Sequence, residues 1–198
     1  MKKVRWRGGA LIAPLPPVMV TCGTEEEPNV LTIAWTGILN TIPPKTYISV
    51  RPSRYSYNLI KDSKEFIINL TTAELVKACD YCGVKSGDKF NKFEDMKLTT
   101  QKASVVSVPL LEQSPVSIEC KVTDIVPLGS HDMFIADIVA VNVAEELIDS
   151  SGKLHLDKAN LVAYSHGEYF ELGRKLGSFG FSVQRKKKKS YHKNKRSD

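Results

Sequence analysis

The sequence is poor in cysteine and has no long apolar run. Its four cysteines among 198 residues are too few to build a disulfide framework for a chain of this length. No uninterrupted apolar stretch approaches the roughly 18 residues that a membrane-spanning helix needs. The N-terminus combines cations with an apolar segment, as a secretory signal does, but Pro14, Pro16 and Pro17 interrupt that segment. We therefore expect a cytoplasmic protein without a membrane segment.

Sequence fingerprints of several common chemistries are also missing. No G-x-G-x-x-G follows a predicted strand, and no G-x-x-x-x-G-K-[ST] occurs. Neither G-x-S-x-G nor H-E-x-x-H is present. The spacing of His155, His166 and His192 is not that of metal ligands. These absences argue against a Rossmann dinucleotide fold, a serine hydrolase and a zinc protease, and we expect no metal site.

The positive charge of the chain is concentrated at its C-terminus. The net charge is +6, but residues 183–198 hold eight Lys and Arg against one acid, which leaves −1 for the rest. This segment has too few apolar residues to bury a core, so we expect a disordered tail after a domain at 1–182. A weak contact of the tail with RNA, anionic lipid or a partner protein is the alternative.

Two of the cysteines, Cys79 and Cys82, form a C-x-x-C motif. A redox-active dithiol needs this motif at a helix N-terminus, where the helix dipole stabilises the thiolate. Here the pair lies at the end of a helix-like run that Gly83 is expected to terminate. We interpret both cysteines as packing residues, with redox or metal use as the alternatives.

The hydrophobic pattern predicts a mainly β protein. Strands are predicted at 18–22, 30–35, 46–50, 65–70, 116–125, 133–143 and 161–164. Short helices are predicted from an N-cap at Ser53 to about residue 62, and from Thr71 or Thr72 to Cys82, with a polar loop or short helix at 86–93. Gly37 and Asn40 loosen the chain before the Pro43-Pro44 pair, which allows neither a helix nor a central strand. Because strands and helices do not alternate, an antiparallel barrel with helical insertions fits better than a parallel sheet.

The stretch at 49–56, SVRPSRYS, concentrates groups that favour anions at one strand-to-helix corner. The first turn of a helix presents unpaired backbone N–H groups and the positive end of its dipole. Arg51 and Arg54 can donate paired hydrogen bonds to phosphate oxygens, and Ser53 and Ser56 offer hydroxyl donors. The alternative is a helix start whose arginines pair with neighbouring acids such as Asp62 or Glu65.

The segment before this corner favours a ligand. NVLTIAWTG places Asn29, Thr32, Trp35 and Thr36 on a strand and loop that lead toward the corner. A flat heterocycle binds well at such an edge, where Trp35 can stack on it. Packing of Trp35 in the core is the alternative. His131, in the turn GSHD between two long strands, can donate to a ligand oxygen or stay a solvated turn residue.

The ordered set NVLTIAWTG, PPKTYISVRPSRYSYNLI, FIIN, CGVKSGDKFNKF and GSHDMF resembles the flavoredoxin branch of the flavin reductase-like, FMN-binding split-barrel family. The resemblance runs from about residue 14 to 169. It implies an antiparallel split β-barrel with short helical insertions, a homodimer, and FMN held near the subunit interface.

The resemblance also implies which residues contact FMN. Asn29, Thr32, Ala34, Trp35 and Thr36 would line the flavin ring or its ribityl chain. The phosphate would be held by Arg51, Ser53, Arg54 and Ser56, while Lys92, His131 and Tyr164 would reach the cofactor from other segments. Because the flavin carries the chemistry, no protein residue is predicted to be catalytic.

Three functions remain open at this stage. The first is a flavin reductase that takes electrons from NAD(P)H through FMN to an acceptor. The second is a non-enzymatic FMN electron carrier that exchanges electrons with a redox partner protein. The third is a nucleic-acid or membrane-associated module that acts through the basic tail, and we expect it least because the charge of the body is close to zero.

Overall fold

Seven antiparallel strands form the main sheet, in the order β2-β1-β5-β8-β9-β4-β3. The computed structural model describes residues 1–183, so the predicted tail lies outside the described residues apart from Val183. The strands of this sheet are β1 (Val18–Gly23), β2 (Pro28–Ile33), β3 (Thr36–Thr41), β4 (Pro44–Val50), β5 (Glu65–Leu70), β8 (Val116–Pro127) and β9 (Asp132–Val143). Three hairpins pair β1 with β2, β3 with β4 and β8 with β9. Strand β5 joins the first to the third by pairing with β1 and β8, and β4 pairs with β9.

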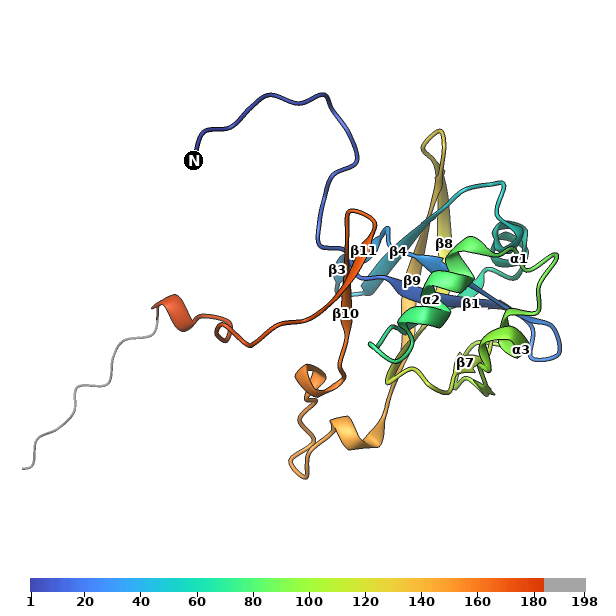
Figure 1. The fold of residues 1–198 in the computed structure, drawn as a ribbon. Helices are drawn as coiled ribbons and strands as arrows, with labels where there is room; N and C mark the ends of the chain where they lie inside the picture. The colour runs from blue at the N-terminus through green and yellow to red at the C-terminus, as the bar shows by residue number, and fades with distance from the viewer. Residues whose placement is uncertain (184–198) are drawn as a thin grey trace, which may run out of the picture.

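Two small sheets and three helices complete the fold. The small sheets pair β6 (Thr100–Gln101) with β7 (Leu110–Leu111), and β10 (Val162–Ser165) with β11 (Glu168–Glu171). The helices are α1 (Tyr55–Ser63), α2 (Val76–Val84) and α3 (Lys92–Met96), and single 3-10 turns lie at Glu145–Leu147, Leu156–Lys158 and Phe181–Val183. In Figure 1 the three α-helices gather on one side, while the β10–β11 hairpin and both ends of the described chain lie on the other.

Burial of β-branched and aromatic side chains holds the main sheet together. The largest cluster takes side chains from β1, β2, β4, β5, β8 and β9, and helix α1 covers it with the fully buried Ile60. Phe66 and Phe134 are its largest fully buried members. A second cluster joins Met19 and Val30 to helix α2. Every strand of the main sheet except the edge strand β3 therefore places at least one face in these clusters, and β1 places both.

Strand β3 lies in a segment for which no strand was predicted. The strand pairs with β4 at the edge of the sheet, and Pro44 begins β4 where it pairs with Thr41. Side chains support the pairing, since Thr46 donates from Oγ1 to the carbonyl of Gly37 at 2.9 Å. An edge strand tolerates residues of low strand propensity, because only one of its sides needs backbone partners.

Two helix boundaries also differ from the predictions. Helix α2 continues through Gly83 to Val84, so Gly83 does not terminate it. The helix begins at Val76, because Thr72 instead accepts a hydrogen bond from the backbone of Leu75 in the preceding turn. The residues at 86–93 form a loop up to Asn91, and α3 begins at Lys92.

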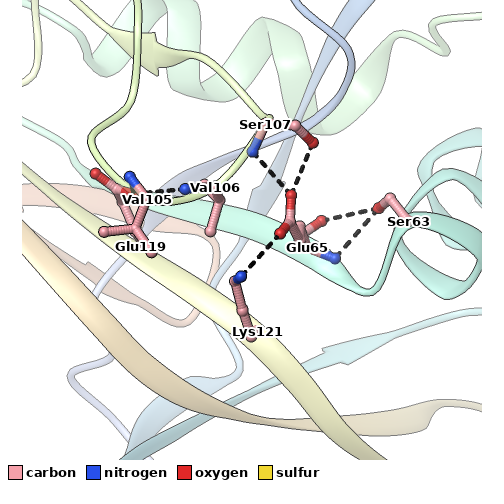
Figure 2. Close-up of polar contacts among 7 residues, drawn as sticks. All are labelled: Ser63, Glu65, Val105, Val106, Ser107, Glu119 and Lys121. Atoms are coloured by element: carbon pink, nitrogen blue, oxygen red, sulfur yellow. Dashed lines mark hydrogen bonds and ion pairs between the residues drawn. The ribbon is translucent and has the colours of Figure 1, made fainter.

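Two carboxylates hold the segment 104–107 against the sheet (Figure 2). The fully buried Glu119 accepts hydrogen bonds from the backbone N–H groups of Ser104, Val105 and Val106, at 2.8, 2.7 and 3.0 Å. Glu65 on the neighbouring strand accepts from the backbone and the hydroxyl of Ser107, at 2.8 and 2.7 Å. A carboxylate offers several acceptor sites, so each can satisfy more than one donor of a segment that forms little regular structure of its own.

The two terminal segments extend away from the body (Figure 1). Residues 1–14 are exposed, and so are nearly all of residues 171–183. Within residues 1–183, no helix has both the length and the apolar character to cross a membrane.

Candidate functional site

A cavity of about 730 Å³ lies where the end of β4 meets the start of α1. Most of its wall comes from five places that are distant in sequence: the end of β2 with residues 34 and 35, the 49–56 corner, the second half of α2 with the loop after it, the β8–β9 turn, and the β10–β11 hairpin. Pro17 and Lys92 complete the wall. Sites for small molecules and cofactors usually have volumes of roughly 300–1,000 Å³. The cavity therefore has the size of a cofactor site.

The 49–56 corner forms a turn and then the first turn of α1. The helix begins at Tyr55, and its N-cap residue is Arg54 rather than the predicted Ser53. No side chain of the described residues 1–183 caps this helix, so the first-turn N–H groups lack the usual side-chain acceptor there. The corner thus keeps the donors of a helix N-terminus available for an anion, although the cap differs from the predicted one.

The two arginines of the corner face the cavity. Arg54 donates from Nη1 to the carbonyl of Gly83 at 3.2 Å, and Arg51 donates from Nε to Nε2 of His131 at 3.4 Å. Among residues 1–183 neither arginine forms an ion pair, so the alternative of a pairing with Asp62 or Glu65 is not realised. Both guanidinium groups keep donors for a ligand.

Trp35 and His131 form an aromatic pair at the cavity. Their ring centroids lie 4.6 Å apart with the planes tilted by 44°. Trp35 is 42% exposed, so it is not a core residue. Partial burial and the nearby charges of Arg51 and Arg54 lower the pKa of His131, which favours the neutral imidazole. Because Nε2 accepts from Arg51, Nδ1 is the nitrogen that carries the hydrogen and faces the hydroxyl of Ser130 at 3.0 Å.

Asn29 lies behind the cavity and supports the corner. Its side chain is buried, and Nδ2 donates to the hydroxyl of Ser56 at 2.6 Å. This bond leaves the hydroxyl hydrogen of Ser56 free to point elsewhere. The oxygen of Asn29 fits against Gly87, where a Cβ atom would come within 2.2 Å of it. Asn29 lines a neighbouring cavity of about 740 Å³ instead of the first one.

Lys92 lies between the two cavities and lines both. The side chain is 4% exposed, and its ammonium group donates to the carbonyls of Val30 and Cys82 at 2.6 and 3.1 Å. An ammonium group has three donors, so one remains for a ligand. Burial lowers the pKa of Lys92, and the two carbonyls offset part of the cost of keeping the charge.

The remaining predicted residues divide between the cavity and the sheet. Thr32, Ala34 and Tyr164 line the cavity, and Thr32 also bonds to the carbonyl of Cys79. Thr36 does not line it, because its hydroxyl donates to the carbonyl of Tyr47 at 2.6 Å in the β3–β4 hairpin. Apart from Asn29 and Thr36, then, the predicted residues are brought together around one cavity.

Sequence reasoning missed several residues that line the same cavity. Asp80 on α2, Lys85 and Ser86 in the loop after it, and Tyr169 on β11 all contribute to its wall. The motif CGVKSGDKF contains Lys85 and Ser86, and its mixture of glycine and polar residues was a usable signal. For Asp80 and Tyr169 the sequence contains no such signal, because the two residues are 89 positions apart and only the fold brings them into contact.

The C-x-x-C cysteines belong to the core. Cys79 and Cys82 are 0% and 1% exposed and pack in the cluster under α2. Burial raises the pKa of both thiols, that of Cys82 to about 12. Among residues 1–183 there is no group of three or more potential metal ligands. These observations support the packing interpretation, since an activated thiol needs a lowered pKa.

Comparison with known proteins identifies the family. A family model described as "Flavin reductase like domain" matches residues 12–173. A protein of Archaeoglobus fulgidus is 32% identical over 157 residues, which cover 79% of this chain and 87% of that protein.

Two solved structures are similar to the whole fold. Flavoredoxin of Desulfovibrio vulgaris (Miyazaki F) is 27% identical, with a TM-score of 0.85 over 92% of this chain and 100% of that chain. An FMN-binding protein from Thermus thermophilus shares the fold at 22% identity, with a TM-score of 0.74 over 90% of this chain and 99% of that chain. The likeness confirms the predicted fold class, an antiparallel split barrel with short helical insertions. The chain therefore belongs to the flavin reductase-like family.

Proposed function

We propose that this protein binds FMN in the cavity beside the 49–56 corner and transfers electrons through it. The observation that carries this proposal is the meeting of phosphate-type donors and aromatic rings in one cavity. Arg51, Ser53, Arg54 and Ser56 line it together with Trp35, His131 and Tyr164. Membership of the flavin reductase-like family supports FMN as the ligand, as does the name of the Thermus protein that shares the fold.

The residues present fit such a ligand. The phosphate would lie at the corner, where two guanidinium groups and an uncapped helix start offer charge-assisted hydrogen bonds. Asn29 would keep the Ser56 hydroxyl in place from behind. Lys92, with one free donor, would offer a hydrogen bond to a polar atom of the ring system, and His131 would hold Arg51 and Trp35 in place beside it.

Bound FMN would supply the electron transfer, and the chain would bind, orient and shield it. We propose NAD(P)H as the electron donor and assign no acid or base of the protein to that step. A transient donor needs only access to the ring, and Trp35 beside it is 42% exposed. The description of the family as flavin reductase-like supports this direction of electron flow.

A non-enzymatic electron carrier is the second candidate. The likeness to the flavoredoxin of D. vulgaris favours it, because the match covers that entire chain. A carrier would exchange electrons with a redox partner protein instead of a nicotinamide. Both candidates place the same cofactor in the same cavity and differ in the electron donor alone.

Anaerobic reduction of the FMN-loaded protein separates the two. The reductase predicts rapid bleaching of the flavin absorbance after mixing with NADH or NADPH in a stopped-flow instrument. Slow bleaching despite tight FMN binding would support the carrier. A protein that stays colourless and takes up no FMN would contradict both.

We further propose a homodimer that covers the edge strand β3. Ile38, Leu39 and Ile42, on β3 and the turn after it, are 67%, 46% and 89% exposed. Strand β3 ends the seven-stranded sheet, so within residues 1–183 one side of its backbone has no partner strand. Light scattering should give the mass of a dimer, and Ile38→Glu with Ile42→Glu should convert it to a monomer. A monomeric wild-type protein at tens of micromolar would contradict the proposal.

The four cysteines are all free thiols, which supports the expected cytoplasmic location.

A further inference from the structure

The β10–β11 hairpin is a separate two-stranded sheet that forms one wall of the cavity. Its first strand is fixed to the body by main-chain bonds. The backbone of Tyr164 exchanges two hydrogen bonds of 2.8 Å with Leu15, and Val162 donates to the carbonyl of Thr71 at 3.2 Å. A lone two-stranded hairpin is only marginally stable in water, so its second strand depends on side-chain contacts with the body.

Tyr169 provides such a contact from the second strand. It lies directly opposite Tyr164 in the register, and the two rings meet edge to face with centroids 5.2 Å apart. The phenol of Tyr169 donates to Oδ1 of Asp80 on helix α2 at 3.3 Å. The ring also packs against the apolar cluster under α2. Asp80, Tyr169 and Tyr164 therefore follow one another from the helix to the cavity wall, and all three line the cavity.

The Tyr169–Asp80 bond has the properties of a contact that can open. O–H···O bonds in proteins are usually about 2.5–3.0 Å long, so a bond of 3.3 Å is weak. Burial, together with the nearby Cys79 and Asp80, raises the pKa of Tyr169. The phenol is therefore a neutral donor throughout the physiological pH range. Asp80 is exposed, so water can replace either partner when the bond breaks.

We propose that Asp80 and Tyr169 form a latch between α2 and β11 that positions the Tyr164 ring in the cavity wall and slows release of the bound flavin. The second half of this statement rests on the proposed FMN site. The first half concerns the protein alone. Asp80 and Tyr169 are positioning residues here, because they act on the ligand through the ring of Tyr164.

Two measurements test the latch with three single variants and one double variant. Tyr169→Phe and Asp80→Ala each remove the hydrogen bond, whereas Asp80→Asn keeps an oxygen acceptor. We expect the first two to raise the FMN dissociation rate about 2- to 10-fold, the effect of one ordinary hydrogen bond. Asp80→Asn should keep the FMN dissociation rate within about twofold of wild type. The double variant Tyr169→Phe with Asp80→Ala should release FMN no faster than either single variant, because both changes remove the same bond. Amide hydrogen exchange of the FMN-free protein should accelerate in β10 and β11 by a similar factor.

The chain contains a matched control. Tyr81, the next residue on α2, donates its hydroxyl to Asp95 at 2.7 Å, and neither partner lines the cavity. Tyr81→Phe removes the same kind of bond and should change neither the dissociation rate nor the exchange of the hairpin.

Three results would overturn the latch: equal dissociation rates for wild type and Tyr169→Phe, equal effects of Asp80→Asn and Asp80→Ala, or hairpin exchange that stays unchanged. If the wild-type protein takes up no FMN, the proposed function fails instead, and the exchange measurement still decides whether the latch exists.

Discussion

The buried carboxylate of Glu119 allows a quantitative test of what holds the segment 104–107 in place. Replacement by glutamine keeps the size of the side chain and exchanges one acceptor oxygen for an NH₂ donor. One oxygen of Glu119 serves Ser104 and the side chain of Asn142, and the other serves Val105 and Val106. In either orientation of the glutamine, two N–H groups lose their acceptor and face another donor.

The expected cost follows from these two lost bonds. A buried donor without a partner costs about 1–3 kcal/mol, and Ser104 and Val105 lie at exposed positions, so Glu119→Gln should lower the free energy of unfolding by about 1–4 kcal/mol. That is a large fraction of the roughly 5–15 kcal/mol by which proteins of this size are stable. Urea unfolding followed by tryptophan fluorescence and circular dichroism should show a lower midpoint at an unchanged slope. Glu112→Gln, the same change at an exposed carboxylate, should stay within about 0.5 kcal/mol of wild type.

The pH dependence provides a second check on Glu119. Burial raises the pKa of this carboxyl group, but the bonds from Asn142 and from the segment 104–106 outweigh burial, so the net pKa lies below the ordinary value. The carboxylate therefore contributes stability that is fully present above the unfolded pKa of about 4.3 and is lost as the pH falls through the folded pKa. The difference between wild type and Glu119→Gln should shrink as the pH falls below about 4. A difference under about 1 kcal/mol at pH 7, or one that grows in acid, would refute the reasoning.

Four further predictions concern the cavity and the thiols. Gly87→Ala places a Cβ atom 2.2 Å from the oxygen of Asn29, so it should displace Asn29 from Ser56. In a fluorescence titration this variant should bind FMN about tenfold more weakly than wild type. Gly173→Ala, where the added Cβ atom meets open space, should leave the affinity unchanged. Arg51→Ala with Ser53→Ala should weaken FMN more than riboflavin in the same titration, and equal losses would mean that these residues do not touch the phosphate. Deletion of residues 184–198 should leave the affinity for FMN unchanged, and a large loss would contradict the assignment of the binding domain to 1–182. The native protein should not react with a thiol reagent at pH 8, because burial raises the pKa of Cys22 to about 11 and that of Cys82 to about 12. Rapid labelling of the folded protein would contradict this prediction.

The strands and the corner could be predicted because their signals are local. The alternation in 30–35 and the long β-branched runs around residues 120 and 138 reflect one buried face per strand. The crowded donors at 49–56 are adjacent in sequence, and the fold keeps them together. The N-cap was wrong by one residue: serine is the better capping residue, but among residues 1–183 no side chain caps this helix, so the preference for serine does not decide where it begins.

What could not be predicted depends on partners that are distant in sequence. Strand β3 exists because β4 pairs with it, although Gly37 and Asn40 are weak strand formers. Tyr169 enters the cavity wall because α2 supplies Asp80 and the cluster beneath it. Thr36 was predicted to line the flavin, but its hydroxyl donates to the carbonyl of Tyr47 within the sheet.

Burial of the C-x-x-C motif limits thiol–disulfide exchange between this protein and small thiols in solution. Small thiols such as glutathione would need the packed cluster under α2 to open before they could reach Cys79 or Cys82. We therefore expect the protein to be insensitive to changes in the cellular thiol pool, because small thiols do not reach its buried cysteines. If the cavity holds FMN as proposed, electrons enter and leave through the flavin, and the molecule that reaches the flavin decides what the protein reduces.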